Sequence, residues 1–233
     1  MTKGHRVKIL ILFVMGLIAP CFSDSFESVA IIPGSSEDEV WVVVNRTIDS
    51  NTVRYIEVFQ PLDWGSDSND IYFVDSGTDA NDSLTHLEGE TVVLLGDAIP
   101  DPNSYTVSSG AITTYTSHTN ETIGLPYTSI YETMPLVKMS QMGSSNSKRI
   151  RIINVIIDFY ESLACNMGVE GNTSSLQFSE DSFATVLEPV TELKGPIPFV
   201  GGWTREPVIY IDVNEPVPLS IRALYPNIEI VED

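Results

Sequence analysis

The sequence is poor in basic residues. Its 233 residues hold 12 Lys and Arg against 32 Asp and Glu, which gives a formal net charge of -20 at pH 7. A nucleic-acid-binding surface needs Lys and Arg to replace the counterions of the phosphates. The composition therefore argues against simple DNA or RNA binding.

Cysteine and histidine are also scarce. Two cysteines, Cys21 and Cys165, do not make a disulfide framework. Cys165 has no histidine near it in the sequence, which favours a buried or idle thiol over a nucleophile. His86 and His118 are isolated, whereas a zinc site needs grouped ligands.

The acidic segment 67–79 lacks the central Gly and the terminal Glu of an EF-hand loop, so we interpret it as a solvated loop. We expect no metal and no cofactor.

Known catalytic motifs are absent from the chain. It contains no Gly-x-Ser-x-Gly, no phosphate loop, no dinucleotide fingerprint and no His-Glu-x-x-His. Glu88 and Glu90 could oppose Asp97 and Asp101 as a glycosidase pair. However, these two glutamates precede an apolar strand, where carboxylates normally face water. We expect no catalytic residue and no enzymatic activity.

Long apolar runs are missing as well. The run Ile9 to Ala19 is too short to span a bilayer. Three basic residues precede it and Cys21-Phe22-Ser23 follows it, a pattern typical of a signal peptide cleaved after Ser23. Residues 1–23 are therefore expected to be a signal-like leader, or the result of a misplaced start, and the mature chain is expected to have no membrane span.

The residues that are abundant are those of a β protein, namely Val, Ile, Thr, Ser and Tyr, with Gly and Pro spread along the chain. Alternating apolar positions predict a β-hairpin from 39–46 and 52–60. The segment 149–162 predicts the longest strand, with a β-bulge near 152–153 because the apolar parity changes there. Shorter strands are predicted at 28–34 and 71–77. No helix of convincing length is predicted.

The predicted fold is mainly β: a β-sandwich or sheet platform with an inserted small β-barrel-like module. The platform is expected to be discontinuous, formed by residues 24–77 and 125–233. The inserted module is expected at 78–124, where strands become short and Asp, Asn, Gly and Pro separate them. We expect 166–207 to be rich in loops. The last two strands are expected to form a hairpin around Asn214-Glu215-Pro216.

Several stretches occur together in a distinctive order. They are "FESVAIIPGSSEDEVWVVVNRTI", "RYIEVFQPLDW", "FVDSG", "LTHLEGETVVLLGD", "GLPYTSIYETMPL", "RIINVIIDFYESLACNMG" and "VNEPVPLSIRALYPNIE". This set resembles the C-terminal part of the tail tubular protein B, nozzle or stabilisation proteins of short-tailed bacteriophages. The motif residues that carry the resemblance, and to which we assign a structural role, are Asp75, Gly77, His86, Leu87, Glu88, Gly89, Glu90, Gly124, Pro126 and Tyr127.

The resemblance implies a structural protein of the virion tail. Such a protein forms a ring of identical copies, hexameric in the better-known relatives, and contacts other tail, adaptor or fibre proteins. The ring continues the DNA channel and helps to retain and then eject the genome. An acidic channel wall suits this role because it does not grip phosphates, so DNA passes without specific binding. Relatives are longer, with a β-rich region before the part that this sequence resembles.

A second hypothesis rests on the leader. The chain would be a secreted or periplasmic β-rich protein that loses a signal peptide and presents its loops to a receptor or a glycan. Trp64 and Trp203 flank Gly-rich loops, where they could act as interface anchors.

Overall fold

The computed structural model describes residues 25–34, 38–59, 74–78, 81, 83–137, 139–140, 143–144, 148–177 and 189–231. Within these ranges the regular structure is β-strand, apart from one 3-10 turn, η2 (Leu84–Leu87). The mainly β class is confirmed. The predicted leader, Trp64 and most of the acidic segment 67–79 lie outside the described residues.

The N-terminal part of the chain forms two antiparallel sheets. The first has the order β1–β2–β3, with bounds β1 (Ser25–Pro33), β2 (Asp38–Ile48) and β3 (Asn51–Val58). The second has the order β4–β7–β5–β6, with bounds β4 (Asp75–Thr78), β5 (Thr91–Gly96), β6 (Ile99–Thr106) and β7 (Glu121–Leu125). In the part of the chain that the structure describes, this second sheet is open rather than a closed barrel.

The C-terminal part forms two further antiparallel sheets. One has the order β14–β11–β16, with bounds β11 (Ile150–Phe159), β14 (Leu193–Pro198) and β16 (Ile221–Ile230). The other has the order β13–β12–β15–β8, with bounds β8 (Ser129–Glu132), β12 (Ala164–Val169), β13 (Asn172–Gln177) and β15 (Tyr210–Val213). A small hairpin pairs β9 (Met139–Ser140) with β10 (Gly143–Ser144).

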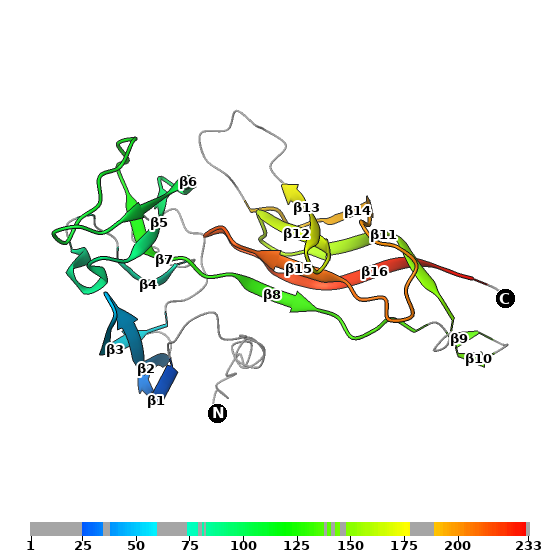
Figure 1. Ribbon diagram of the computed structural model, residues 1–233, viewed down its shortest axis with the longest axis horizontal. Helices are drawn as coiled ribbons and strands as arrows, with labels where there is room; N and C mark the ends of the chain where they lie inside the picture. Colours follow the sequence, from blue (N-terminus) through cyan, green and yellow to red (C-terminus); the bar gives the residue numbers. More distant parts are fainter. Residues whose placement is uncertain are drawn as a thin grey trace, which may run out of the picture.

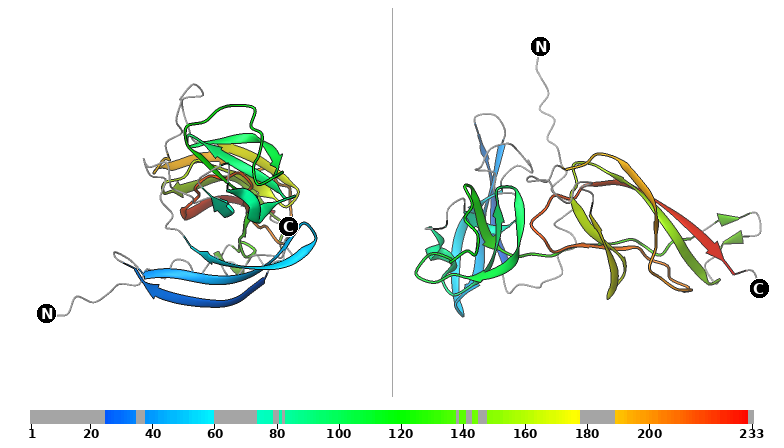
Figure 2. Two further views of the ribbon diagram at one scale, coloured as in Figure 1. Left: turned by 90° about the vertical axis from the view of Figure 1, so that its left-hand side faces the viewer. Right: turned by 90° about the horizontal axis from the view of Figure 1, so that it is seen from above.

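The molecule is elongated, with two lobes along its long axis (Figures 1 and 2). We call residues 25–125 the N-terminal lobe and residues 126–231 the C-terminal lobe. Each lobe has its own hydrophobic core. The first is built from Ile48, Leu84, Leu87, Val92, Leu94, Tyr105, Val107, Ile112, Ile123 and Leu125, with Val53 and Tyr55 packed against it. The second includes Ile152, Val155, Ile157, Phe159, Leu163, Cys165, Met167, Ile209 and Ile211. The β2–β3 hairpin thus shares a core with residues 84–125, while the domain division expected from the sequence stays a prediction.

The hairpin of β2 and β3 follows from its turn and its alternation. Asp49 and Ser50 both have positive φ, +46° and +63°, as a two-residue turn that matches the twist of the strands requires. Along β2, every second residue from Val42 to Ile48 is buried. Arg46 falls on this inward-facing set, so the strand carries a cation toward the interior.

Strand β11 contains the predicted bulge. Its pairing with β16 shifts between Ile152 and Asn154. Ile153 is therefore left without a partner in β16 and is 42% exposed, while Ile152 and Val155 are buried. The extra residue reverses the alternation, which lets both apolar parities of the sequence face one core.

One sequence prediction is wrong. The last two strands do not form a hairpin, because β15 pairs with β12 and β8 whereas β16 pairs with β11. The connection between them, which includes Pro216 and Pro218, crosses from one sheet to the other. The segment 166–207, which was expected to be rich in loops, contains most of β12 and all of β13 and β14.

Candidate functional site: the Arg46 network

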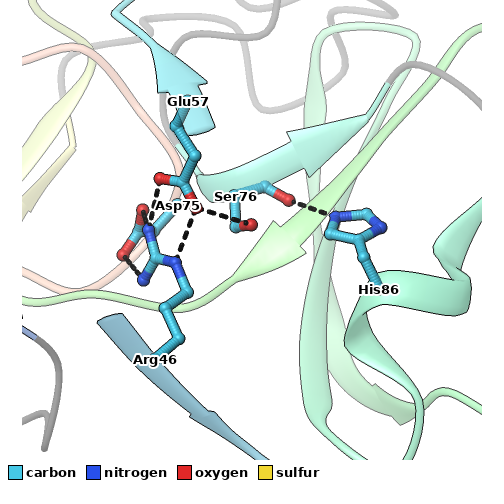
Figure 3. A network of polar contacts seen from close by, with 5 residues as sticks. All are labelled: Arg46, Glu57, Asp75, Ser76 and His86. Carbon is cyan, nitrogen blue, oxygen red and sulfur yellow. Dashed lines mark hydrogen bonds and ion pairs between the residues drawn. The ribbon is translucent and has the colours of Figure 1, made fainter. Parts of the chain in front are cut away.

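The most highly connected polar group among the described residues is Arg46. It projects from β2 into the space between β3 and β4, where Glu57 and Asp75 face it (Figure 3). Arg46 Nε and Nη2 donate to the two carboxylate oxygens of Glu57 at 2.7 and 2.6 Å. Nη1 and Nη2 donate to those of Asp75 at 2.9 and 2.6 Å. Both pairs are bidentate, the geometry that a guanidinium fork favours.

Burial makes this arrangement electrostatically strong. Arg46 is only 3% exposed. Its desolvation alone would lower its pKa, but hydrogen bonds and charge from Glu57 and Asp75 outweigh that effect, so the pKa is raised. The guanidinium is charged at every accessible pH, and two carboxylates surround one cation. Removing the cation would leave two partly buried negative charges next to each other, which is far costlier than losing an exposed ion pair.

The network continues to the 3-10 turn (Figure 3). Ser76 Oγ donates to Glu57 Oε1 at 3.2 Å, and the Ser76 carbonyl oxygen lies 2.9 Å from His86 Nε2. Tyr55 Oη donates to the His86 carbonyl oxygen at 2.6 Å, and the two rings meet edge to face. Ser76 has a φ of +52°, an unusual value for a non-glycine residue. We use the name Arg46 network for Arg46, Glu57, Asp75, Ser76 and His86.

Several motif residues that are distant in sequence lie next to this network. A Cβ on Gly124 would come within 2.7 Å of the Asp75 carbonyl oxygen and 2.9 Å of the Gly77 Cα, so glycine is what allows β4 to lie on β7. The Tyr127 pKa is raised because its hydroxyl is desolvated and Asp75 adds negative charge, although the residue as a whole is 38% exposed. Pro126, which lies between Gly124 and Tyr127 in the sequence, is half-buried.

The other motif residues form the turn after η2. Leu87 is fully buried in the core of the N-terminal lobe. Glu88 is exposed, but its two carboxylate oxygens each accept a 2.8 Å hydrogen bond, from the backbone N–H groups of Ser109 and Gly110. Glu90 Oε1 accepts from the Asp49 N–H at 2.8 Å, which joins the turn to the β2–β3 hairpin. Gly89 takes a φ of +83° between them. These two acids were expected to face water. Glu88 is exposed and Glu90 is half-buried, and both also hold loops together.

The aspartates of the same stretch act in the same way. Asp97 accepts hydrogen bonds from the N–H groups of Thr119 and Asn120. Asp101 accepts from the Asn103 N–H and from the Tyr105 hydroxyl. Partial desolvation would raise the pKa of Asp101, but these hydrogen bonds outweigh it and the pKa is lowered. Glu88 and Asp97 thus hold loops that are distant in sequence, and Asp101 holds its own loop.

Cys165 lies in the core of the C-terminal lobe, only 3% exposed. Burial, with a smaller effect from the charge of Asp212, raises its pKa to about 12. The expectation of a buried thiol is confirmed. A pocket beside it, lined in part by Asn166 and Val217, has a volume of about 20 Å³, room for about one water molecule.

Two features are absent from the described residues. No group of three His, Cys, Asp or Glu residues there is placed to hold a metal ion. No helix there is long and apolar enough to cross a membrane.

No protein-family model and no curated protein matches the chain. The Arg46 network must therefore be judged from its geometry. Sequence reasoning identified Asp75 and His86 as motif residues but missed Arg46, although a signal was present. An arginine at the fourth inward position of the series Val40, Val42, Val44 indicates a buried cation that needs carboxylate partners.

Proposed function

We propose that this protein is a non-catalytic structural component of a short bacteriophage tail. In this proposal, copies of the chain form part of the wall of the DNA channel, and they help to retain the genome and then release it. The order of sequence motifs, which resembles the nozzle family, supports the proposal.

The single observation that carries the proposal is the charge of the N-terminal lobe. Residues 25–125 hold two basic residues against 17 acidic ones, a formal net charge of -15. Both basic residues are already paired. Arg46 is buried between Glu57 and Asp75, and Arg54 Nε donates to Glu27 at 2.7 Å. A surface of this kind has little with which to hold phosphates, so DNA can slide past it.

The acids of this lobe also suit a rigid scaffold. Glu88, Glu90, Asp97 and Asp101 use their carboxylates to fix loops, and the Arg46 network joins three strands. A channel wall must keep its shape while a charged polymer moves along it. Carboxylates that accept backbone N–H groups give rigidity without adding a binding site for phosphate.

Mass spectrometry of purified phage particles tests the proposal. We expect peptides from both lobes in the particle, at a copy number per virion similar to that of other ring-forming tail proteins. Detection only in the culture supernatant, with an N-terminus at Asp24, would overturn the proposal. That result would support the second hypothesis, a secreted β-rich protein that binds a receptor or a glycan, which rests on the basic and apolar pattern of residues 1–23.

A further inference from the structure

The basic residues of this acidic protein are concentrated in one region. Residues 126–233 hold seven Lys and Arg, and three of them, Lys148, Arg149 and Arg151, lie within four positions at the start of β11. Arg149 and Arg151 are exposed and Lys148 is half-buried. Within the part of the chain that the structure describes, none of the three has an ion-pair partner within 4 Å.

A second segment brings another arginine and a tryptophan to the same place. The N–H and C=O groups of Ile150 and Thr204 bond to each other at 2.7 and 3.0 Å in an isolated antiparallel bridge. Because the order is antiparallel, the bridge sets Arg149 beside Arg205 and Arg151 beside Trp203. Ile150 is buried, so its neighbours along the strand point outward. Arg205 is exposed and Trp203 is 41% exposed. We call Arg149, Arg151, Trp203 and Arg205 the basic tip.

The basic tip has the composition of a binding surface rather than of a solvated strand end. Two arginines placed side by side repel each other in the free protein. The nearby acids, Glu229 opposite Arg151 in β16 and Glu206 next to Arg205, form no ion pair with them within 4 Å. Arg and Trp are the residues most enriched at the energetic centres of protein interfaces. An acidic partner would relieve the repulsion and cover the indole ring.

The N-terminal lobe carries a complementary surface. All nine residues of the edge strand β1 are exposed, among them Val29 at 66%, Ile31 at 68% and Ile32 at 46%. Among the described strands β1 pairs only with β2, so its outer edge is open. A long apolar edge strand is an aggregation hazard unless something covers it. Asp38 and Glu39, both exposed, lie opposite Pro33 and Ile32 at the end of this strand. We call β1 with Asp38 and Glu39 the acidic edge.

The two surfaces cannot meet within one chain. The acidic edge belongs to one lobe, and the basic tip lies at the far end of the other, near the C-terminus (Figure 1). One surface offers carboxylates and aliphatic side chains, and the other offers guanidinium groups and an indole. We infer that the basic tip of one copy of this chain binds the acidic edge of a second copy.

Such a contact is heterologous, because it joins two different surfaces. Repeated head to tail, it produces a ring if the rotation closes and an open chain if it does not. The inference rests on the proposed function for the expectation that copies assemble, and it adds the residues that join them. DNA is the less favoured partner, since the tip has few cations and the body of the molecule is strongly acidic.

Charge reversal with complementation tests the inference on the purified full chain. The double variant Arg149→Glu/Arg151→Glu makes the tip acidic, and Asp38→Lys/Glu39→Lys makes the edge basic. Each variant alone should self-associate at least about tenfold more weakly than the wild type in sedimentation velocity at about 50 mM NaCl. An equimolar mixture of the two should regain assembly, because every contact again joins opposite charges. Two misfolded variants would not rescue each other.

A control variant carries the same charge change outside the basic tip. Arg222→Glu makes the same charge change as Arg151→Glu elsewhere on the C-terminal lobe, and it should leave assembly within about twofold of the wild type. A wild-type chain that stays monomeric up to about 100 µM would overturn the inference, as would a mixture that fails to assemble. Unchanged assembly of the tip variant together with lost binding of a duplex DNA would assign the tip to nucleic acid instead. None of these results bears on whether the protein is present in virions, so failure of the inference and failure of the proposed function remain separable.

Discussion

Arg46 connects three strands of the N-terminal lobe through its two carboxylate partners. It is a cation on the inward face of a strand whose other inward positions are aliphatic, and it is stabilised there only because β3 and β4 each supply a carboxylate. The alternation of β2 was predictable from the sequence. The partners were not, because Glu57 and Asp75 look like ordinary surface acids until the sheets are assembled.

Replacing Arg46 should destabilise the N-terminal lobe strongly. We expect Arg46→Ala to lower the free energy of unfolding by about 3–5 kcal/mol, because Glu57 and Asp75 lose their shared cation. Arg54→Ala is the control, since its ion pair with Glu27 is exposed and should contribute little to stability. Urea unfolding followed by circular dichroism measures both. Equal losses for the two variants would show that the Arg46 network is no more than a surface ion pair.

Cys165 should be unreactive in the folded protein. Its pKa is raised to about 12, so the thiolate that attacks disulfide reagents is scarce at pH 8, and the side chain is buried. In a Cys21→Ser background we expect no reaction with a disulfide reagent until urea unfolds the chain. The sign for stability follows, because a raised pKa favours the native state below pH 9 and this contribution is lost as the pH rises toward about 12. Rapid labelling of the native protein at pH 8 would contradict the buried placement.

Among the strands, the local pattern of apolar residues predicted the features that depend on neighbouring residues alone. The β2–β3 hairpin and the bulge in β11 were both readable from the apolar alternation. The predicted final hairpin does not form. β15 and β16 have acceptable hairpin spacing, but each strand pairs in a different sheet. Which sheet a strand joins depends on contacts between residues far apart in sequence, and these leave no mark on local alternation.

The pairing of β4 with β7 should depend on the absence of a side chain at Gly124. In Gly124→Ala the new methyl group would lie 2.7 Å from the Asp75 carbonyl oxygen, so backbone must move. We expect a loss of about 1–3 kcal/mol in stability and faster amide exchange in β4 and β7. Gly202→Ala is the matched control, because no atom lies within 4 Å of the added methyl group there. Hydrogen exchange with mass spectrometry distinguishes the two, and equal exchange in both variants would argue against the close approach.

At the scale of the whole molecule, separate cores imply separate unfolding. We expect calorimetry of the full chain to show two transitions, since the two hydrophobic clusters share no residue. Arg46→Ala should lower only one of them. Met167→Ala, which leaves a cavity in the core of the C-terminal lobe, should lower only the other. A single transition that both substitutions shift equally would show that the lobes unfold as one unit.

The charge of the molecule was predictable from the sequence, but its distribution in space was not. The composition shows a strongly acidic chain. Only the fold shows that both basic residues of the N-terminal lobe form ion pairs. It also shows that three arginines lie close together at the far end of the other lobe. The candidate site is likewise a product of tertiary structure, because Asp75, His86 and Gly124 come together only when β4, η2 and β7 pack.

We propose that this protein is part of the wall of a tail channel. Electron cryomicroscopy of purified phage particles tests it most directly. We expect density for this two-lobed β structure, repeated around the tail axis below the portal, with the N-terminal lobe closer to the DNA. A complete tail reconstruction whose densities are all explained by other proteins would contradict the claim.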